Sequence, residues 1–79
     1  MGVSPLVVCV ANGLHEKAKL LIDHGADVNI RYGELASTPL HLAFECEDDE
    51  MIELLLKHKA DYTALNKNLQ TPIAFTNER

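Results

Sequence analysis

The sequence predicts an all-α fold, a solenoid of stacked helix-turn-helix units that are joined by β-hairpin-like loops. Three tripeptides, Ser4-Pro5-Leu6, Thr38-Pro39-Leu40 and Thr71-Pro72-Ile73, recur 34 and 33 residues apart, and each opens a short apolar run. Residues 18–27 also align with residues 52–61 at a shift of 34. A period of this length, with two short helical patterns and a turn-rich join in each copy, is typical of stacked repeats that share one core.

The first helix of each unit is expected to begin at the proline of the tripeptide. Proline suits the first helical position because the amide that it lacks has no helical partner there, and the preceding Ser or Thr is a good N-cap. After Thr38, residues 40–44 supply a short apolar face, which the acidic residues 45–50 interrupt. The first helix is therefore predicted to be about two turns long.

A second helix in each unit is predicted from apolar residues at the three-and-four spacing of a buried helical stripe. This stripe comprises Met51, Ile52, Leu54, Leu55 and Leu56 in the second unit and Ala18, Leu20, Leu21 and Ile22 in the first. Asp48 or Asp49 can cap the start of the helix in the second unit. Gly25 supplies a left-handed residue that ends the helix in the first unit, whereas at the equivalent Lys59 the chain must either adopt that conformation at a cost of about 1 kcal/mol or end the helix in another way.

The two joins, residues 27–37 and 61–70, are predicted to be extended and hairpin-like, because they lack a helical period and contain turn formers. The turn formers are Tyr32-Gly33 in the first loop and Asn66-Lys67-Asn68 in the second. The first loop has one additional residue. We expect this insertion to swing Tyr32 and Glu34 outward.

Two longer motifs resemble those of the ankyrin repeat family. Residues 38–43, Thr38-Pro39-Leu40-His41-Leu42-Ala43, are similar to the family's helix-opening hexapeptide, and residues 20–29 are similar to its second-helix ending and hairpin entry. The resemblance implies one ankyrin-repeat domain over residues 1–79, with units at about 4–37 and 38–70 and a partial unit at 71–79. Leu69 stands where the family usually has glycine, so either that turn is remodelled or Leu69 is an exposed apolar contact.

The resemblance also implies a function. In this family the hairpin tips and the concave face of the first helices bind other proteins, which indicates a non-catalytic protein–protein interaction scaffold. Position by position, the partner-binding residues would be Glu34, Leu35, Ser37, Glu45, Cys46, Lys67, Asn68 and Gln70, and the insertion adds Arg31 and Tyr32. Tyr and Arg are residue types that often dominate binding energy. The alternative function is a structural or capping segment of a longer ankyrin array, which positions a neighbouring domain.

His41 admits a functional and a structural interpretation. It lies near Glu45 and Cys46 on the same predicted helix, so it could act as a metal ligand or a general base. The structural interpretation, implied by the resemblance and favoured here, is that its two ring nitrogens hold the helix-opening turn together. Val7 and Ala74 take this position in the flanking units, where we expect a looser turn.

The other histidines are interpreted as structural. His24 and His58 are in register at the ends of the second helices, where an imidazole meets the negative end of the helix dipole. Packed helices lie about 10 Å apart, which is too far for both rings to bind one zinc ion at about 2 Å. His15 is expected in the turn between the helices of the first unit, with no identified partner.

Half of the acidic residues gather in one short segment. They are Glu45, Glu47, Asp48, Asp49, Glu50 and Glu53, six of the twelve acids in the chain. Their spacing does not match a calcium-binding loop, so a solvated turn with helix-capping acids is favoured over a docking site for a basic partner. The net charge of -5, with seven scattered basic residues, argues against nucleic-acid binding.

Several classes of function lack their signatures. No glycine-rich phosphate loop, nucleophile elbow or Cys-x-x-Cys pair is found, so we expect no catalysis, no cofactor and no metal. No apolar stretch approaches the roughly 20 residues of a membrane span, and residues 1–5 do not resemble a secretory signal, so we expect no membrane association. Cys9 at a small packed position and Cys46 near a turn suit a reducing compartment, which predicts an intracellular protein, cytoplasmic or nuclear.

Both ends of the predicted stack present apolar residues rather than a polar cap. The favoured explanation is that the chain is a piece of a longer array; end-to-end self-association and a third helix that caps the second unit are the alternatives. Two minor hypotheses are a redox sensor built on Cys46, which requires a low thiol pKa, and hydroxylation of Asn29, whose structural role would be to bond the hairpin backbone.

Overall fold

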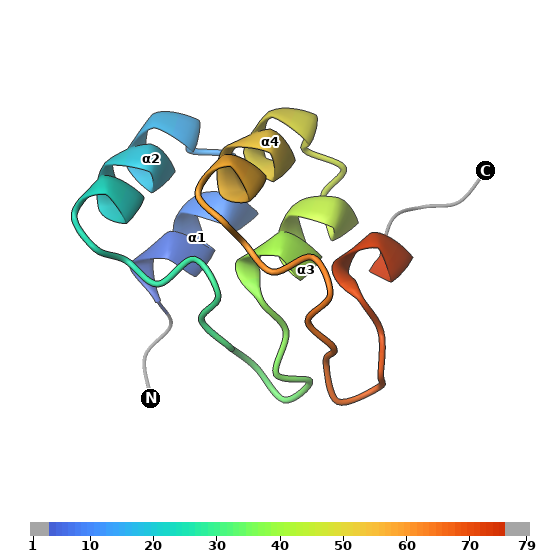
Figure 1. The fold of residues 1–79 in the computed structure, drawn as a ribbon. Helices are drawn as coiled ribbons and strands as arrows, with labels where there is room; N and C mark the ends of the chain where they lie inside the picture. Colours follow the sequence, from blue (N-terminus) through green and yellow to red (C-terminus); the bar gives the residue numbers. More distant parts are fainter. Residues whose placement is uncertain (1–3, 76–79) are drawn as a thin grey trace.

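The computed structural model describes residues 4–75 of the chain, and its regular elements are helical. They are α1 (Pro5–Ala11), α2 (His15–Asp23), α3 (Pro39–Glu45), α4 (Asp49–Lys57) and the 3-10 helix η1 (Pro72–Phe75). Figure 1 shows two layers, with α1, α3 and η1 in the inner layer and α2 and α4 in the outer one. Within the described residues the β structure is one isolated bridge between Tyr32 and Ser37, which confirms the all-α prediction.

The helix starts follow the predicted capping chemistry. The side chain of Ser4 accepts a hydrogen bond from the Leu6 amide at 3.1 Å, and Thr38 caps α3 by accepting from the His41 amide at 3.4 Å. Asp48, rather than Asp49, caps α4. These oxygens satisfy amides that have no partner inside their own helix, which is why the short helices begin where they do.

Left-handed residues end the helices in both units. Gly13 and Gly25 have φ angles of 68° and 100° in the first unit, and Glu47 and Lys59 take the equivalent positions in the second with 56° and 73°. The left-handed conformation of Lys59 is the first of the two endings predicted for this helix, whereas that of Glu47 was not predicted. Since side chains with a Cβ adopt this region at a cost of about 1–2 kcal/mol, the second unit carries strain that the first unit avoids.

The core lies between the two layers and continues from one unit to the next. Leu6 of α1 is 1% exposed, and Leu40 of α3 and Met51 and Leu55 of α4 are each 0% exposed. Contacts join α1 to α3 within the inner layer and each inner helix to the outer helix of its own unit. Burying a side chain of this size contributes about 1.5–3 kcal/mol, so these residues account for much of the stability of the stack.

Part of the predicted apolar stripe is exposed. Leu20 is 57% exposed and Leu56 is 40% exposed, so the sequence analysis was wrong to place them with the buried residues. Leu20 is two residues away from both Ala18 and Ile22, and on a helix with 3.6 residues per turn it therefore lies on the other side. Leu55 is fully buried, as predicted.

The third unit begins as the sequence predicted but is not an α-helix over the described residues. Pro72 is buried and η1 packs against α3. Ile73 is 62% exposed, although Leu6 and Leu40 at the equivalent positions are buried. The difference arises because, within residues 4–75, no second helix follows η1. A single 3-10 turn is common for such a short piece of chain.

Candidate functional site

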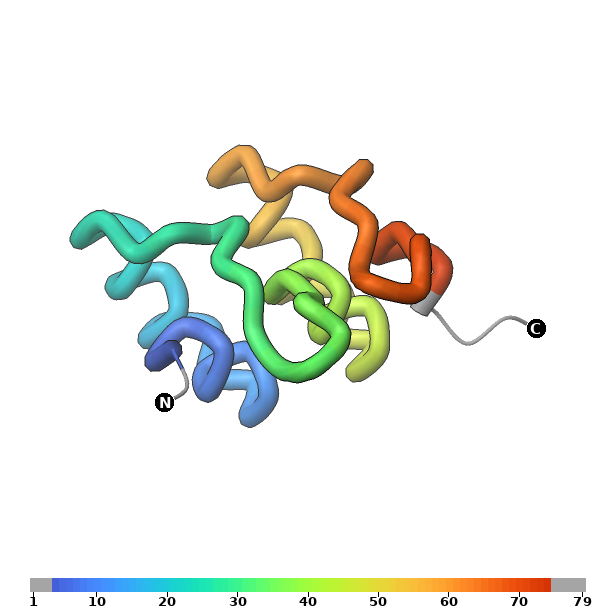
Figure 2. The backbone as a smooth tube through the Cα atoms, turned by 90° about the horizontal axis from the view of Figure 1, so that it is seen from below, coloured from blue at the N-terminus to red at the C-terminus, as the bar shows by residue number. Residues whose placement is uncertain are grey.

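The two hairpin loops form one continuous surface. They run side by side beyond the inner helices (Figure 2), and the amide of Lys67 in the second loop donates to the carbonyl of Leu35 in the first at 2.7 Å. The guanidinium of Arg31 donates through Nη1 to the carbonyl of Leu65 at 2.6 Å and to that of Ala36 at 2.9 Å. Because the main chains are bonded across the units, the loop tips hold a fixed spacing.

The first loop is closed by a backbone pair between Tyr32 and Ser37, with N–O distances of 2.9 and 3.0 Å. The turn of residues 33–36 accommodates the additional residue, with positive φ angles at Gly33 and Ala36. Tyr32 is consequently half-buried rather than swung outward, and Ser37 is only 5% exposed. The predictions that Tyr32 points outward and that Ser37 is a surface residue are therefore wrong. Glu34 is exposed, as expected.

Asn66 organises the second loop. Its side-chain oxygen accepts hydrogen bonds from the amides of Asn68 and Gln70 at 2.9 and 3.0 Å, and its side-chain nitrogen donates to the Gln70 side chain at 3.1 Å. Asn66 is 3% exposed. Gln70 therefore uses both its amide and its side chain within the loop, which reduces what it can offer to a partner. The sequence identified Asn66 as a turn former but not as a buried residue.

His41 links the start of α3 to the second loop. Its Nδ1 accepts from the amide of Thr38 at 3.1 Å, and its Nε2 lies 2.8 Å from the carbonyl oxygen of Gln70. A carbonyl oxygen only accepts, so Nε2 carries the hydrogen. The ring is fully buried. This geometry confirms the structural interpretation of His41 and extends it, because the same ring positions the loop of the following unit.

The last turn of α3 lies close to the first loop. Burial raises the pKa of the Tyr32 phenol, and the charges of Glu45 and Cys46 raise it further. Burial, followed by the charges of Glu45 and Asp48, likewise raises the pKa of the exposed Cys46 thiol. The redox-sensor hypothesis required a low thiol pKa, so the electrostatics contradict it.

The candidate partner-binding residues divide by exposure. Exposed side chains are those of Arg31, Glu34, Leu35, Glu45, Cys46, Lys67 and Asn68; those of Tyr32 and Gln70 are half-buried, and that of Ser37 is buried. Three exposed apolar or aromatic residues on the loops lie outside this set: Tyr62 at 68%, Leu65 at 46% and Leu69 at 77%. Leu69 could be found from sequence because it replaces an expected glycine, and its exposure matches the predicted apolar contact, while its φ of 61° lies in the left-handed region. Tyr62 and Leu65 have no comparable signal.

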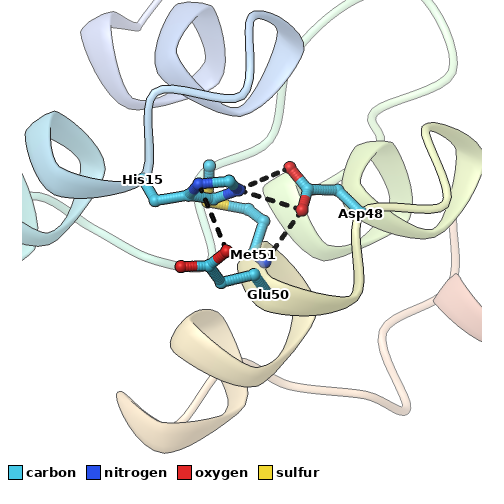
Figure 3. Close-up of polar contacts among 4 residues, drawn as sticks. All are labelled: His15, Asp48, Glu50 and Met51. Carbon is cyan, nitrogen blue, oxygen red and sulfur yellow. Dashed lines mark hydrogen bonds and ion pairs between the residues drawn. The ribbon is translucent and has the colours of Figure 1, made fainter.

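A second polar site joins the outer helices. His15 is the first residue of α2, and its Nε2 lies 2.9 and 2.8 Å from the two carboxylate oxygens of Asp48 (Figure 3). Its Nδ1 lies 3.7 Å from a carboxylate oxygen of Glu50. The expectation that His15 has no partner is therefore wrong, because its partners belong to the next unit and only stacking brings them near. The expectation that His15 lies in the turn between the helices is also wrong, because it begins α2.

The remaining polar residues have structural contacts. His24 and His58 lie at the ends of α2 and α4, where their Nδ1 atoms are 2.9 and 3.0 Å from the carbonyls of Leu20 and Leu54. The side-chain oxygen of Asn29 accepts from an amide in the second loop, that of Asp61, at 2.7 Å. Asn29 thus has the backbone-bonding role that the sequence analysis favoured, while its hydroxylation stays a prediction.

The described residues contain neither a cluster of metal-ligating side chains nor a helix that could cross a membrane. In residues 4–75, no group of three or more His, Cys, Asp or Glu side chains is arranged to hold a metal ion. None of the helices in this part of the chain combines the length and the hydropathy that a bilayer crossing requires.

Comparisons with known proteins give further similarities. Residues 1–73 match the family model described as Ankyrin repeats (3 copies). Among curated relatives, "Putative E3 ubiquitin-protein ligase XBAT35" of Arabidopsis thaliana is 40% identical over 74 residues, covering 91% of this chain and 16% of the relative. The 2-5A-dependent ribonuclease of Homo sapiens is 37% identical over 67 residues, covering 85% of this chain and 9% of the relative.

A third relative is the BTB/POZ domain and ankyrin repeat-containing protein BOP of Lupinus luteus, which is 40% identical over 65 residues and covers 81% of this chain and 13% of the relative. The chain thus spans less than a fifth of the length of these curated relatives. The repeated tripeptides, the two-layer stack and the family-model match agree. The chain belongs to the ankyrin repeat family.

Proposed function

We propose that this chain is a non-catalytic protein–protein interaction module, which binds a partner through the hairpin loops and the concave face of the first helices. Ankyrin repeats generally mediate such interactions. The observation that carries the proposal is the bonding between the two loops, from the Lys67 amide to the Leu35 carbonyl and from Arg31 to the Leu65 carbonyl. A surface held in this way loses little conformational entropy on binding, and preorganisation favours affinity.

The chemistry of the loop surface also supports protein binding. Leu35, Leu65 and Leu69 are 40%, 46% and 77% exposed, and the charged Glu34 and Lys67 lie on the same two loops. Apolar contacts surrounded by polar groups are the usual composition of a protein interface. The partner would be a protein with a small apolar surface and polar groups at its edge, rather than a nucleic acid or a membrane.

A non-catalytic role is supported by the state of the polar side chains. Ser37, Thr38, His41 and Asn66 are the buried polar side chains of the described core, and no buried side-chain nitrogen or oxygen there is without a hydrogen-bond partner. Because these polar groups already form hydrogen bonds within the fold, they are not available to act on a substrate. The relatives that are enzymes by name are several times longer than this chain, so their activities support no catalytic proposal here.

We also propose an intracellular location, cytoplasmic or nuclear. Cys9 is buried and Cys46 is exposed, and both are free thiols. An exposed free thiol is typical of a reducing compartment.

The test is partner capture with matched variants. The wild-type chain is immobilised, captured proteins are identified by mass spectrometry, and the affinity of a purified partner is measured. Leu69→Ser and Lys67→Glu alter exposed loop residues, and Lys17→Glu alters an exposed residue of α2 on the outer layer. The loop variants should lose the partner and the α2 variant should keep it, with all three equally folded by circular dichroism. Retention by both loop variants, or loss with Lys17→Glu alone, would refute the proposed surface.

The alternative function, a structural or capping segment of a longer ankyrin array, also has a specific observation behind it. Ile73 is 62% exposed, whereas Leu6 and Leu40 at the equivalent positions are 1% and 0% exposed. A following helix would cover Ile73, and so would a second copy in end-to-end self-association. Sedimentation equilibrium across a concentration series separates these possibilities. If the chain associates and Ile73→Ser abolishes this association, the exposed face of η1 is the contact between copies. A folded monomer indifferent to Ile73→Ser would favour the interaction module.

A further inference from the structure

The contact of His15 with Asp48 and Glu50 connects the outer helices of two successive units. His15 begins α2, Asp48 is the N-cap of α4, and Glu50 lies in the first turn of α4. Figure 3 shows the imidazole lying between the two carboxylates, with one ring nitrogen facing each of them. We infer that His15 is a protonation-dependent latch, which holds α2 against α4 when its ring is charged and loosens this edge of the stack when the ring loses its proton.

The chemistry of the ring carries this inference. Nε2 lies within hydrogen-bond distance of both oxygens of Asp48, and Nδ1 lies 3.7 Å from Oε1 of Glu50. A carboxylate only accepts hydrogen bonds, and a neutral imidazole has one N–H group. In the neutral ring, one nitrogen therefore directs a lone pair toward a negative oxygen. Only the doubly protonated, positively charged ring presents a donor to both carboxylates.

Other charged groups lie around the ring. Glu16 and Lys19 of α2 and Glu50, Glu53 and Lys57 of α4 line the groove that contains His15, and Lys17 of α2 lines a neighbouring hollow beside the same ring. Lys19 also forms an ion pair with Asp23 at the far end of α2, at 3.4 Å. The other helix packed against α2 is α1, whose one ionisable side chain, Cys9, is buried in the core. The charged groups around His15 are thus four carboxylates and three ammonium groups, and the two groups that contact the ring, Asp48 and Glu50, are both carboxylates.

Asp48 is also fixed in place by more than His15. It accepts a hydrogen bond from the Met51 amide at 3.3 Å, and the backbone at Gly13 lies close enough that an added Cβ would be 3.8 Å from Oδ2. The turn between α1 and α2 and the start of α4 therefore meet at this carboxylate. A change in the charge of His15 acts directly on the contact between the units.

At the opposite edge of the stack, the bonds of Lys67 and Arg31 from one loop to the other involve no histidine, and His41 there bonds the second loop to α3 within the core. There the loops are joined by the Lys67 amide, the Leu35 carbonyl and the guanidinium of Arg31, which stays charged at all ordinary pH values. The second outer contact, between His58 and Asp23 at 3.6 Å, is again titratable, and Lys19 shares its carboxylate. Proton loss would therefore weaken the outer edge alone, so that the units pivot about the loops and the curvature of the stack changes.

The first experiment measures urea unfolding of the wild-type chain and of His15→Gln at about pH 5.5 and about pH 8, on either side of the ordinary histidine pKa of about 6.5. Glutamine retains an N–H donor but carries no charge. For each chain, the unfolding curve gives the ratio of folded to unfolded protein. This ratio for the wild type, divided by that for His15→Gln, should be about two- to fivefold larger at the lower pH than at the higher pH, the range expected of partly exposed ion pairs. An equal ratio at both pH values would overturn the latch.

The matched control repeats His15→Gln in a chain with Asp48→Asn and Glu50→Gln. Asparagine is as good an N-cap as aspartate, so α4 keeps its start while both charges are removed. In this background the effect of His15→Gln should no longer change with pH. A pH dependence that persists would assign the effect to another group and refute the inference.

Hydrogen exchange on the wild type tests the pivot without any substitution. After correction for intrinsic exchange rates, protection of the Met51 amide at the start of α4 should fall as the pH rises through the histidine range, while that of the Lys67 amide between the loops should not. Equal loss at both amides, or none at either, would contradict a latch that acts on the outer edge alone.

Discussion

The left-handed residue at the end of α4 offers a quantitative test of the repeat register. Lys59 has a φ of 73° where Gly25 of the first unit has 100°. The left-handed region destabilises a residue with a Cβ by about 1–2 kcal/mol, and a glycine costs about 0.5–1 kcal/mol more in backbone conformational entropy on folding. Lys59→Gly should therefore raise the free energy of unfolding by about 0.5–1 kcal/mol, even though it removes an exposed side chain.

The assay is equilibrium unfolding in urea, followed by far-UV circular dichroism. The reciprocal change, Gly25→Ala, should lower the free energy of unfolding by a similar amount, because an added Cβ at Gly25 meets no atom within 4 Å and the loss comes from the backbone conformation. Glu53→Gly is the matched control. Glu53 is exposed in the middle of α4, where glycine should cost about 1 kcal/mol. If Lys59→Gly destabilises the chain as Glu53→Gly does, the assignment of Lys59 to the left-handed position fails.

Three further predictions concern the core and two titrating groups. Leu55→Ala should cost about 2–5 kcal/mol in urea unfolding and the partly exposed Leu56→Ala clearly less; a loss below about 0.5 kcal/mol at Leu55 would contradict the stacking register. Glu45→Gln should speed alkylation of Cys46 near neutral pH, because one cause of the raised thiol pKa is removed; an unchanged rate would argue against that cause. Hydrogen bonds from Thr63 lower the pKa of Asp61 in the folded chain. The ionised carboxylate therefore stabilises the fold above the ordinary aspartate pKa of about 3.9, and this stabilisation is lost as the pH falls through the lower pKa of the folded state. Asp61→Asn should flatten this part of the curve of unfolding free energy against pH.

Much of the fold was predictable because its signals are local. The proline and the preceding Ser or Thr mark the start of the first helix in each unit through bonds within a few residues, and Leu55 falls on the buried stripe of its own helix. The left-handed turn at Lys59 follows from its alignment with Gly25. The resemblance implied the structural role of His41, and one of the contacts that confirm this role, to Thr38, lies only three residues away.

The candidate surface was predictable only in part. Exposure of Glu34 and Lys67 follows from their places in polar loops, whereas the burial of Ser37 depends on its backbone pair with Tyr32. The exposure of Leu20 depends on which face of α2 meets its neighbours. Apolar character alone does not distinguish a residue on the packed face from one that is two positions away.

The sequence by itself determined the repeat period, the start of the first helix in each unit, the left-handed turn at Gly25 and the family, because each depends on a residue and its close neighbours. Only the tertiary structure decided which side chains join one unit to the next. Arg31 reaches the Leu65 carbonyl and His15 reaches Asp48, at sequence separations of 34 and 33 residues. The physical reason is that hydrogen bonds and ion pairs form only over a few ångströms, and stacking alone brings groups one repeat apart to that distance.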